Sequence, residues 1–175
     1  MSVLFLDESK TKGYTVSAVA ISTPNIVSVR RRVAELRLKG QRRIHFTKES
    51  DRRRRTILST MTSLRVTAHI YSLGSCLSDE EGRRRCLTAL VDDAATLGVS
   101  RIVLEQDDSV IAFDRQVLAL ELASRDNKSV TYRHERAASE PLLWIADAVA
   151  WSYTRGGEWR ERASPLIHSV KEVPL

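Results

Sequence analysis

The sequence of 175 residues is short of cysteine and of long apolar stretches. Its two cysteines, Cys76 and Cys86, have neither the paired CxxC spacing nor the Cys/His spacing of zinc sites, so we expect reduced thiols. Cys86 falls on the apolar face of an expected helix, which predicts a packing role. No apolar run approaches the roughly 20 residues of a membrane span. These absences argue against a disulfide framework, a zinc module and a membrane protein.

Aromatic side chains make up only 6% of the residues, and no expected strand is rich in them. Recognition of single-stranded bases by stacking therefore has little support. The sequence also has no G-x-S-x-G elbow, no P-loop and no G-x-G-x-x-G motif, so no signature of a covalent nucleophile or a nucleotide fold is present. The N-terminus lacks a basic lead and a cleavage signal, so a cytoplasmic location is the expectation.

Positive charge is plentiful. The formal net charge is +6, and 22 of the 28 basic residues are arginine. Arginine is the better phosphate ligand, because its planar guanidinium offers two donors to one anion. The excess favours partners with a phosphate backbone. A GC-rich genome that raises arginine everywhere is the alternative, and composition leaves both open.

Hydrophobic periodicity predicts one domain over residues 1–175, with strands and helices that alternate. Lys10 to Gly13 are typical of a hairpin turn between the first two strands. The order predicts an α/β fold with a mixed sheet, antiparallel first and parallel later, and helices on both faces. Strands are expected at 3–7, 14–21, 66–73, 101–105, 130–135 and 167–170, and helices at 24–40, 50–64, 78–97, 110–123 and 141–153.

Two acidic residues stand where expected strands end. Asp7 follows the apolar run of the first strand, and Glu105 follows that of the fourth. Ligands of open α/β sheets bind at the carboxyl ends of the strands, so these side chains are expected to converge. Two alternatives stay open: Asp7 could begin the hairpin turn, and Asp107 or Asp108 could cap the next helix.

Asp147 is the only charged residue in the apolar segment 142–151. A helix that is apolar all round is buried, and a buried carboxylate is costly unless it is paired or bound to metal. Either an arginine or a metal ion is therefore expected to meet it. Glu140 lies two helical turns earlier on the same face, where it could be a further ligand or an acid that favours the helix dipole.

Carboxylates gathered from two neighbouring strands and one helix are the ligands that hard divalent cations require. Mg²⁺ or Mn²⁺ held in this way can activate water and stabilise the leaving oxygen in phosphodiester hydrolysis. We therefore predict Asp7, Glu105 and Asp147 as catalytic, metal-binding residues, with Glu140 or Asp107 assisting.

Short motifs resemble a known family, the RNase H-like domain of unknown function numbered thirty-eight hundred. They are Phe5-Leu6-Asp7-Glu8-Ser9, Ile44-His45-Phe46, a middle strand that ends in an acid, and Ile145-Ala146-Asp147-Ala148-Val149-Ala150. The resemblance covers nearly the whole chain in element order. It implies an RNase H-like fold in which Asp7, Glu105 and Asp147 hold divalent metal, with Asp107 or Asp108 as alternatives for the middle acid. The family continues D-E-S-G, whereas this chain has Lys10 at the glycine position.

Arginine runs predict a surface for nucleic acid. Four arginines occupy the first turns of the expected helix at 50–64, where cations oppose the helix dipole, and this cost suggests another use. His45 could move a proton or touch phosphate, although a lone histidine is also commonly structural. The runs 30–32 and 83–85 could extend the surface, and scattered solvated faces are the alternative. The predicted contacts are Arg52, Arg53, Arg55, Arg42, Arg43 and His45.

The leading hypothesis is thus a metal-dependent nuclease. The rival is a non-catalytic nucleic-acid-binding module of the same fold, whose acids pair with internal arginines. A third reading is a basic partner of an acidic protein. The sequence leaves open RNA against DNA, internal against terminal cleavage, and the oligomeric state, a homodimer included.

Overall fold

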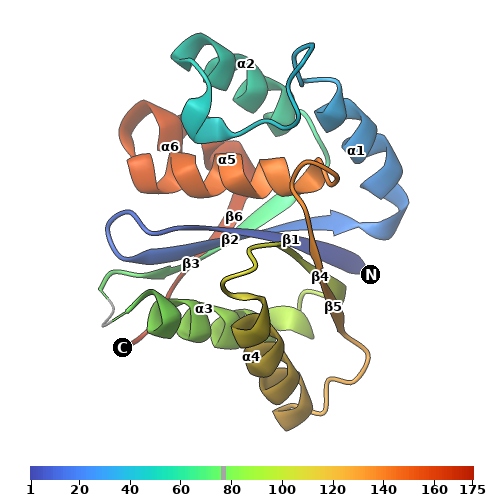
Figure 1. Ribbon diagram of the computed structural model, residues 1–175, viewed down its shortest axis with the longest axis vertical. Helices are drawn as coiled ribbons and strands as arrows, with labels where there is room; N and C mark the ends of the chain where they lie inside the picture. The colour runs from blue at the N-terminus through green and yellow to red at the C-terminus, as the bar shows by residue number, and fades with distance from the viewer. Residues whose placement is uncertain (76–77) are drawn as a thin grey trace.

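The computed structural model describes residues 1–75 and 78–175, so the expectation for Cys76 lies outside the described residues. Six strands form one mixed sheet with helices on both faces (Figure 1). The strands are β1 Ser2–Ser9, β2 Tyr14–Ser22, β3 Thr67–Leu73, β4 Val99–Glu105, β5 Thr131–Glu135 and β6 Ile167–Glu172.

The strand order is β5-β4-β1-β2-β3-β6. β1, β2 and β3 form an antiparallel meander, while β4 lies parallel to β1, β5 parallel to β4, and β6 parallel to β3. Between β1 and β2 the chain reverses through Lys12 and Gly13, which have positive φ angles of 59° and 97°. Any Cβ at Gly13 would also collide with the carbonyl oxygen of Leu73. This topology confirms the predicted fold class.

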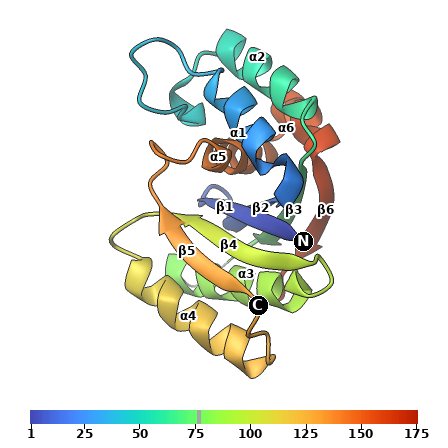
Figure 2. The same ribbon diagram turned by 90° about the vertical axis from the view of Figure 1, so that its right-hand side faces the viewer.

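The helices divide between the two faces of the sheet (Figure 2). One face carries α1 Ile26–Ala34, α2 Asp51–Thr62, α5 Leu142–Arg155 and α6 Gly157–Ala163. The other carries α3 Asp79–Ala94 and α4 Ile111–Ser124. Because side chains alternate along a strand, Phe5 and Val103 join the apolar cluster around α5, while Leu4 and Ile102 join the cluster under α3 and α4.

Local signals place the starts of two helices as expected. The Ser50 hydroxyl accepts a hydrogen bond from the Arg53 N–H at the start of α2, and Ser78 accepts one from the Glu81 N–H at the start of α3. Each satisfies one of the backbone donors that a helix leaves without a partner in its first turn. Cys86 is buried in α3, in agreement with the predicted packing role.

The helix expected up to Gly40 ends six residues earlier, at Ala34. Polar groups beyond that point find partners outside the helix: Arg53 donates to the Leu36 carbonyl at 2.6 Å, and the Leu38 N–H donates to the side chain of Gln41 at 3.0 Å. These contacts, one local and one from α2, take the place of helical hydrogen bonds, and apolar spacing does not reveal them.

α6 was not predicted at all. Gly156 and Gly157, with φ of 74° and 55°, end α5 and start a new helix in another direction. The short segment has Trp159 as its one large apolar side chain, so its sequence shows no hydrophobic periodicity that would predict a helix.

In the part of the chain that the structure describes, no helix has the length and apolar character of a membrane span.

Candidate active site

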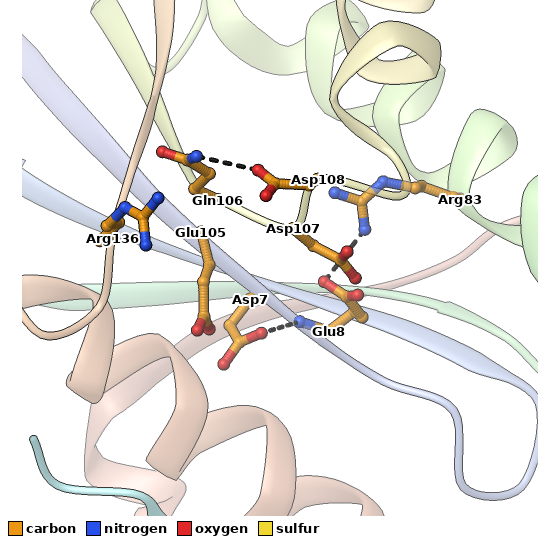
Figure 3. A pocket seen from close by; sticks show the side chains of 8 residues that line it. All are labelled: Asp7, Glu8, Arg83, Glu105, Gln106, Asp107, Asp108 and Arg136. Atoms are coloured by element: carbon orange, nitrogen blue, oxygen red, sulfur yellow. Dashed lines mark hydrogen bonds and ion pairs between the residues drawn. The ribbon is translucent and has the colours of Figure 1, made fainter.

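The sheet register brings two acids together. β1 and β4 are parallel neighbours with Leu6 opposite Leu104, so the next residues, Asp7 and Glu105, lie side by side at the carboxyl ends of both strands. Asp7 has the same parity as Phe5, which faces the α5 cluster. Figure 3 shows the carboxyl groups of Asp7 and Glu105 close together and pointing the same way.

α5 supplies the third acid from above the sheet. Asp147 stands in a helix whose neighbouring residues 142–146 and 148–150 are all buried, and its own side chain is only 13% exposed. The Phe46 backbone N–H donates to its carboxylate at 2.9 Å. Asp7, Glu105 and Asp147 therefore line one cavity of about 370 Å³, together with His45 and Trp151.

Asp7 is the electrostatic centre of the site. Burial raises the pKa of its carboxyl well above the usual 3.8, and the nearby charges of Asp147, Glu8 and Glu105 raise that pKa further. Its recorded hydrogen bond comes from the Glu8 backbone N–H at 2.8 Å, and none of the described basic side chains forms an ion pair with it. Asp7 is thus a partly buried acid among acids, and no described side chain forms an ion pair with it.

Asp147 is less isolated. Burial raises the pKa of Asp147, and this rise is opposed by the Phe46 N–H and by the charges of His45 and Arg43. Arg43 binds Glu105 at 2.6 Å and lies 4.0 Å from the Asp147 carboxylate. One guanidinium from the segment between α1 and α2 therefore spans two of the three predicted acids, which is the pairing that the rival hypothesis expects.

A second cavity, of about 520 Å³, opens on the other side of Asp7 and Glu105 (Figure 3). Glu8, Asp107 and Asp108 add negative charge to its wall, and Arg83 and Arg136 add positive charge. Asp7, Glu8 and Glu105 line both cavities, so the two hollows meet at the acids. The acids thus form the shared base of the two cavities, which we call the acidic floor, and Arg83 and Arg136 lie at the side of the larger cavity.

Beneath this floor, Arg83 holds a buried polar network. Its guanidinium makes a two-pronged ion pair with Asp114 at 2.5 and 2.9 Å and reaches Glu8 at 3.0 Å. Tyr14 accepts a further hydrogen bond from Arg83 at 3.1 Å, and the His134 ring lies 2.8 Å from Asp114. The run 83–85 was expected either to extend a phosphate-binding surface or to lie on a solvated face. Arg83 does neither, since the residue is 6% exposed and ties α3 and α4 to the sheet.

The other predicted acids lie apart from this centre. Both carboxylate oxygens of Glu140 are held by Arg30, at 3.0 and 2.9 Å, and Glu140 lines neither of the two cavities. Asp107 lies exposed on the rim, where the Ser109 hydroxyl and N–H donate to it and lower its pKa. It makes a turn before α4 rather than a cap on it, because Val110 is the capping residue.

The predicted basic contacts are scattered. Arg43 and His45 line the smaller cavity, whereas Arg42 and Arg52 are exposed. Arg53 binds Glu49, and Arg55 binds Glu158.

Sequence reasoning missed the wall residues Glu8, Arg136 and Trp151. Glu8 directly follows Asp7 in β1, and adjacent side chains of a strand point to opposite faces of the sheet. Trp151 follows Asp147 by one helical turn, so the two side chains share a face of α5. Proximity to Asp7 and the four-residue spacing from Asp147 were therefore the signals in the sequence that could have identified Glu8 and Trp151.

The donor set suits a hard divalent cation in its chemistry, because carboxylate oxygens are the preferred ligands and Asp7 lacks a counter-ion. Among residues 1–75 and 78–175, however, no three Asp, Glu, His or Cys side chains are arranged as a ready metal-binding group. Glu105 is engaged by Arg43 in this arrangement. Binding a cation through Glu105 Oε1 would therefore require that oxygen to leave Arg43.

Comparison with known proteins supports the fold. No family model matches the chain, and no curated protein matches its sequence. Among solved structures, the chain resembles RNase HII in the PCNA:RNase HII complex from Archaeoglobus fulgidus, with a TM-score of 0.54 and 18% identity. The match covers 89% of this chain and 73% of that one. The fold is therefore RNase H-like.

Proposed function

We propose that this chain is a metal-dependent nuclease that hydrolyses phosphodiester bonds of RNA or DNA. The observation that carries the proposal is the position of Asp7: a partly buried carboxyl beside Asp147, Glu8 and Glu105, with no ion-pair partner among the described side chains. Such a group costs stability unless a cation meets it, and perturbed acids in a cleft are characteristic of functional sites. The RNase H-like fold is consistent with this function.

In this proposal Asp7, Glu105 and Asp147 hold Mg²⁺ or Mn²⁺. The cation, when bound, supplies Lewis-acid stabilisation of the charge that develops on phosphate oxygens. The chain's own groups fix the ligands: the Glu8 N–H orients Asp7, and the Phe46 N–H orients Asp147. These backbone donors are rigid, so the carboxylates need little reorganisation.

Two side chains beside the acids could act on the substrate. Arg43, once it exchanges Glu105 for phosphate, offers a planar pair of donors to the substrate. His45 lines the same cavity, and its Nδ1 is buried without a hydrogen-bond partner among the described residues. We assign His45 as the group that holds or moves a proton near the reacting phosphate.

A panel of labelled RNA, DNA and RNA–DNA hybrids tests the proposal. We expect cleavage of at least one substrate in Mg²⁺ or Mn²⁺, loss of cleavage in chelator, and loss by about 100-fold or more in Asp147→Asn, because metal ligation contributes several kcal/mol. Asp126→Asn is the matched control, since Asp126 is exposed and its positive φ suits asparagine. Cleavage that survives in Asp147→Asn would refute the assignment.

The contact of Arg43 with Glu105 and Asp147 favours a second candidate, a non-catalytic nucleic-acid-binding module. That protein would retain nucleic acid with a steep salt dependence and would be unaffected by chelator. Binding without cleavage for every substrate in the panel, in either metal, would select this candidate over the nuclease.

A further inference from the structure

A basic cleft lies away from the acids, between α1 and the turn that leads from α2 into β3. Its volume is about 340 Å³, and Arg31, Arg32 and Arg65 line it. No carboxylate belongs to the lining. Three cations from two separate segments thus surround one hollow.

These arginines lack partners, in contrast to most of their neighbours. Arg30, on the same helix, is neutralised by Glu140. Arg31, Arg32 and Arg65 are exposed, and within the described part of the chain their guanidinium groups have no recorded hydrogen bond or ion pair. Like charges that share a hollow repel one another, so the arrangement is relieved when an anion enters.

The two serine hydroxyls that line the cleft already donate elsewhere. The Ser28 hydroxyl already donates to the Asn25 carbonyl, and the Ser63 hydroxyl donates to the Thr60 carbonyl. An anion in the cleft would therefore be bound by guanidinium groups, which match the geometry of phosphate oxygens.

We propose that this basic cleft binds a backbone phosphate of a nucleic acid, at a distance from the phosphate that lies over the acids. This inference rests on the proposed function for its substrate class. Asp7 stands near one end of β1, while Ser2 at the other end pairs with Ser22, which leads into α1. The five residue steps from Ser2 to Asp7 span about 17 Å along the strand. This length corresponds to about five nucleotides at roughly 3.4 Å each along one strand.

Fluorescence anisotropy with a labelled 16-base-pair duplex, measured in chelator, tests the cleft without any requirement for cleavage. The variant Arg31→Gln/Arg32→Gln/Arg65→Gln is expected to bind about tenfold or more weakly at moderate salt. Its salt slope is expected to be smaller by about 1, because the loss of one phosphate contact removes about 0.9.

The matched control is Arg101→Gln/Arg115→Gln/Lys128→Gln, which removes three exposed cations outside the cleft. It should retain affinity within about threefold if the cleft is specific. Equal weakening by the two variants would overturn the proposal, because net charge alone would then explain binding. Where cleavage is observed, the cleft variant should raise KM and leave kcat unchanged, whereas a fall in kcat alone would also contradict it.

Discussion

Asp7→Asn is expected to abolish cleavage and, at the same time, to stabilise the metal-free protein. Cleavage should fall by about 100-fold or more, since the variant loses an anionic metal ligand. The free energy of unfolding should rise, because burial and the neighbouring acids disfavour the charged form of Asp7, and asparagine carries no charge. The asparagine oxygen can still accept the Glu8 N–H, so the fold is preserved. Thermal or urea unfolding in chelator measures the stability, and the same preparation measures the activity.

The pH dependence of stability should carry the same signature. The raised pKa of Asp7 means that the folded protein keeps a proton which the unfolded chain releases near 3.8. Stability from this group is therefore complete below 3.8 and is lost as the pH rises through the folded-state pKa. Asp7→Asn should remove this fall. A variant that is less stable than the parent at neutral pH would contradict the view that Asp7 is an uncompensated charge.

Arg83→Ala is expected to lower the free energy of unfolding by about 3 to 5 kcal/mol, because the fully buried Asp114 would lose its main ion-pair partner. Glu8 would also lose its recorded ion pair. Urea unfolding measures the change. Arg84→Ala is the matched control: this exposed neighbour makes surface contacts with Glu80, Glu81 and the Phe113 ring and should change stability by less than about 0.5 kcal/mol.

A double variant separates the ion pair from simple loss of volume. Arg83→Met/Asp114→Leu removes both charges and keeps apolar bulk, so its loss should be smaller than the sum of the two single losses. Additive losses would show that the network is not coupled, and equal stability of Arg83→Ala and Arg84→Ala would refute the buried pairing.

The sequence predicted the positions of the acidic residues where burial and hydrophobic periodicity determine the structure. The convergence of Asp147, Asp7 and Glu105 could be predicted, because a single charge in an apolar helix is costly and because Asp7 and Glu105 each follow the apolar run of a buried strand. Helical spacing gave the wrong expectation for Glu140. Residues two helical turns apart, such as Glu140 and Asp147, share a face, but about 11 Å along the helix axis separates them, which is too far for one metal ion to bind both. Arg30 holds Glu140 instead.

Arginines were the least predictable part of the site. Arg43 lies in an irregular segment, so its contacts with Glu105 and Asp147 depend on tertiary packing that no local pattern reports. Arg83 and Arg84 are adjacent in one run, yet one is buried and the other exposed. A run of cations shows how much positive charge is present, and only the helix orientation shows which members face the interior.

The central claim is that the three acids gather around a divalent cation rather than around a guanidinium. Anomalous diffraction from crystals soaked in Mn²⁺ tests it most directly. The account predicts one or more Mn²⁺ ions coordinated by carboxylate oxygens of Asp7 and Asp147, with Glu105 released from Arg43. Mn²⁺ bound elsewhere, with Arg43 still between Glu105 and Asp147, would contradict it.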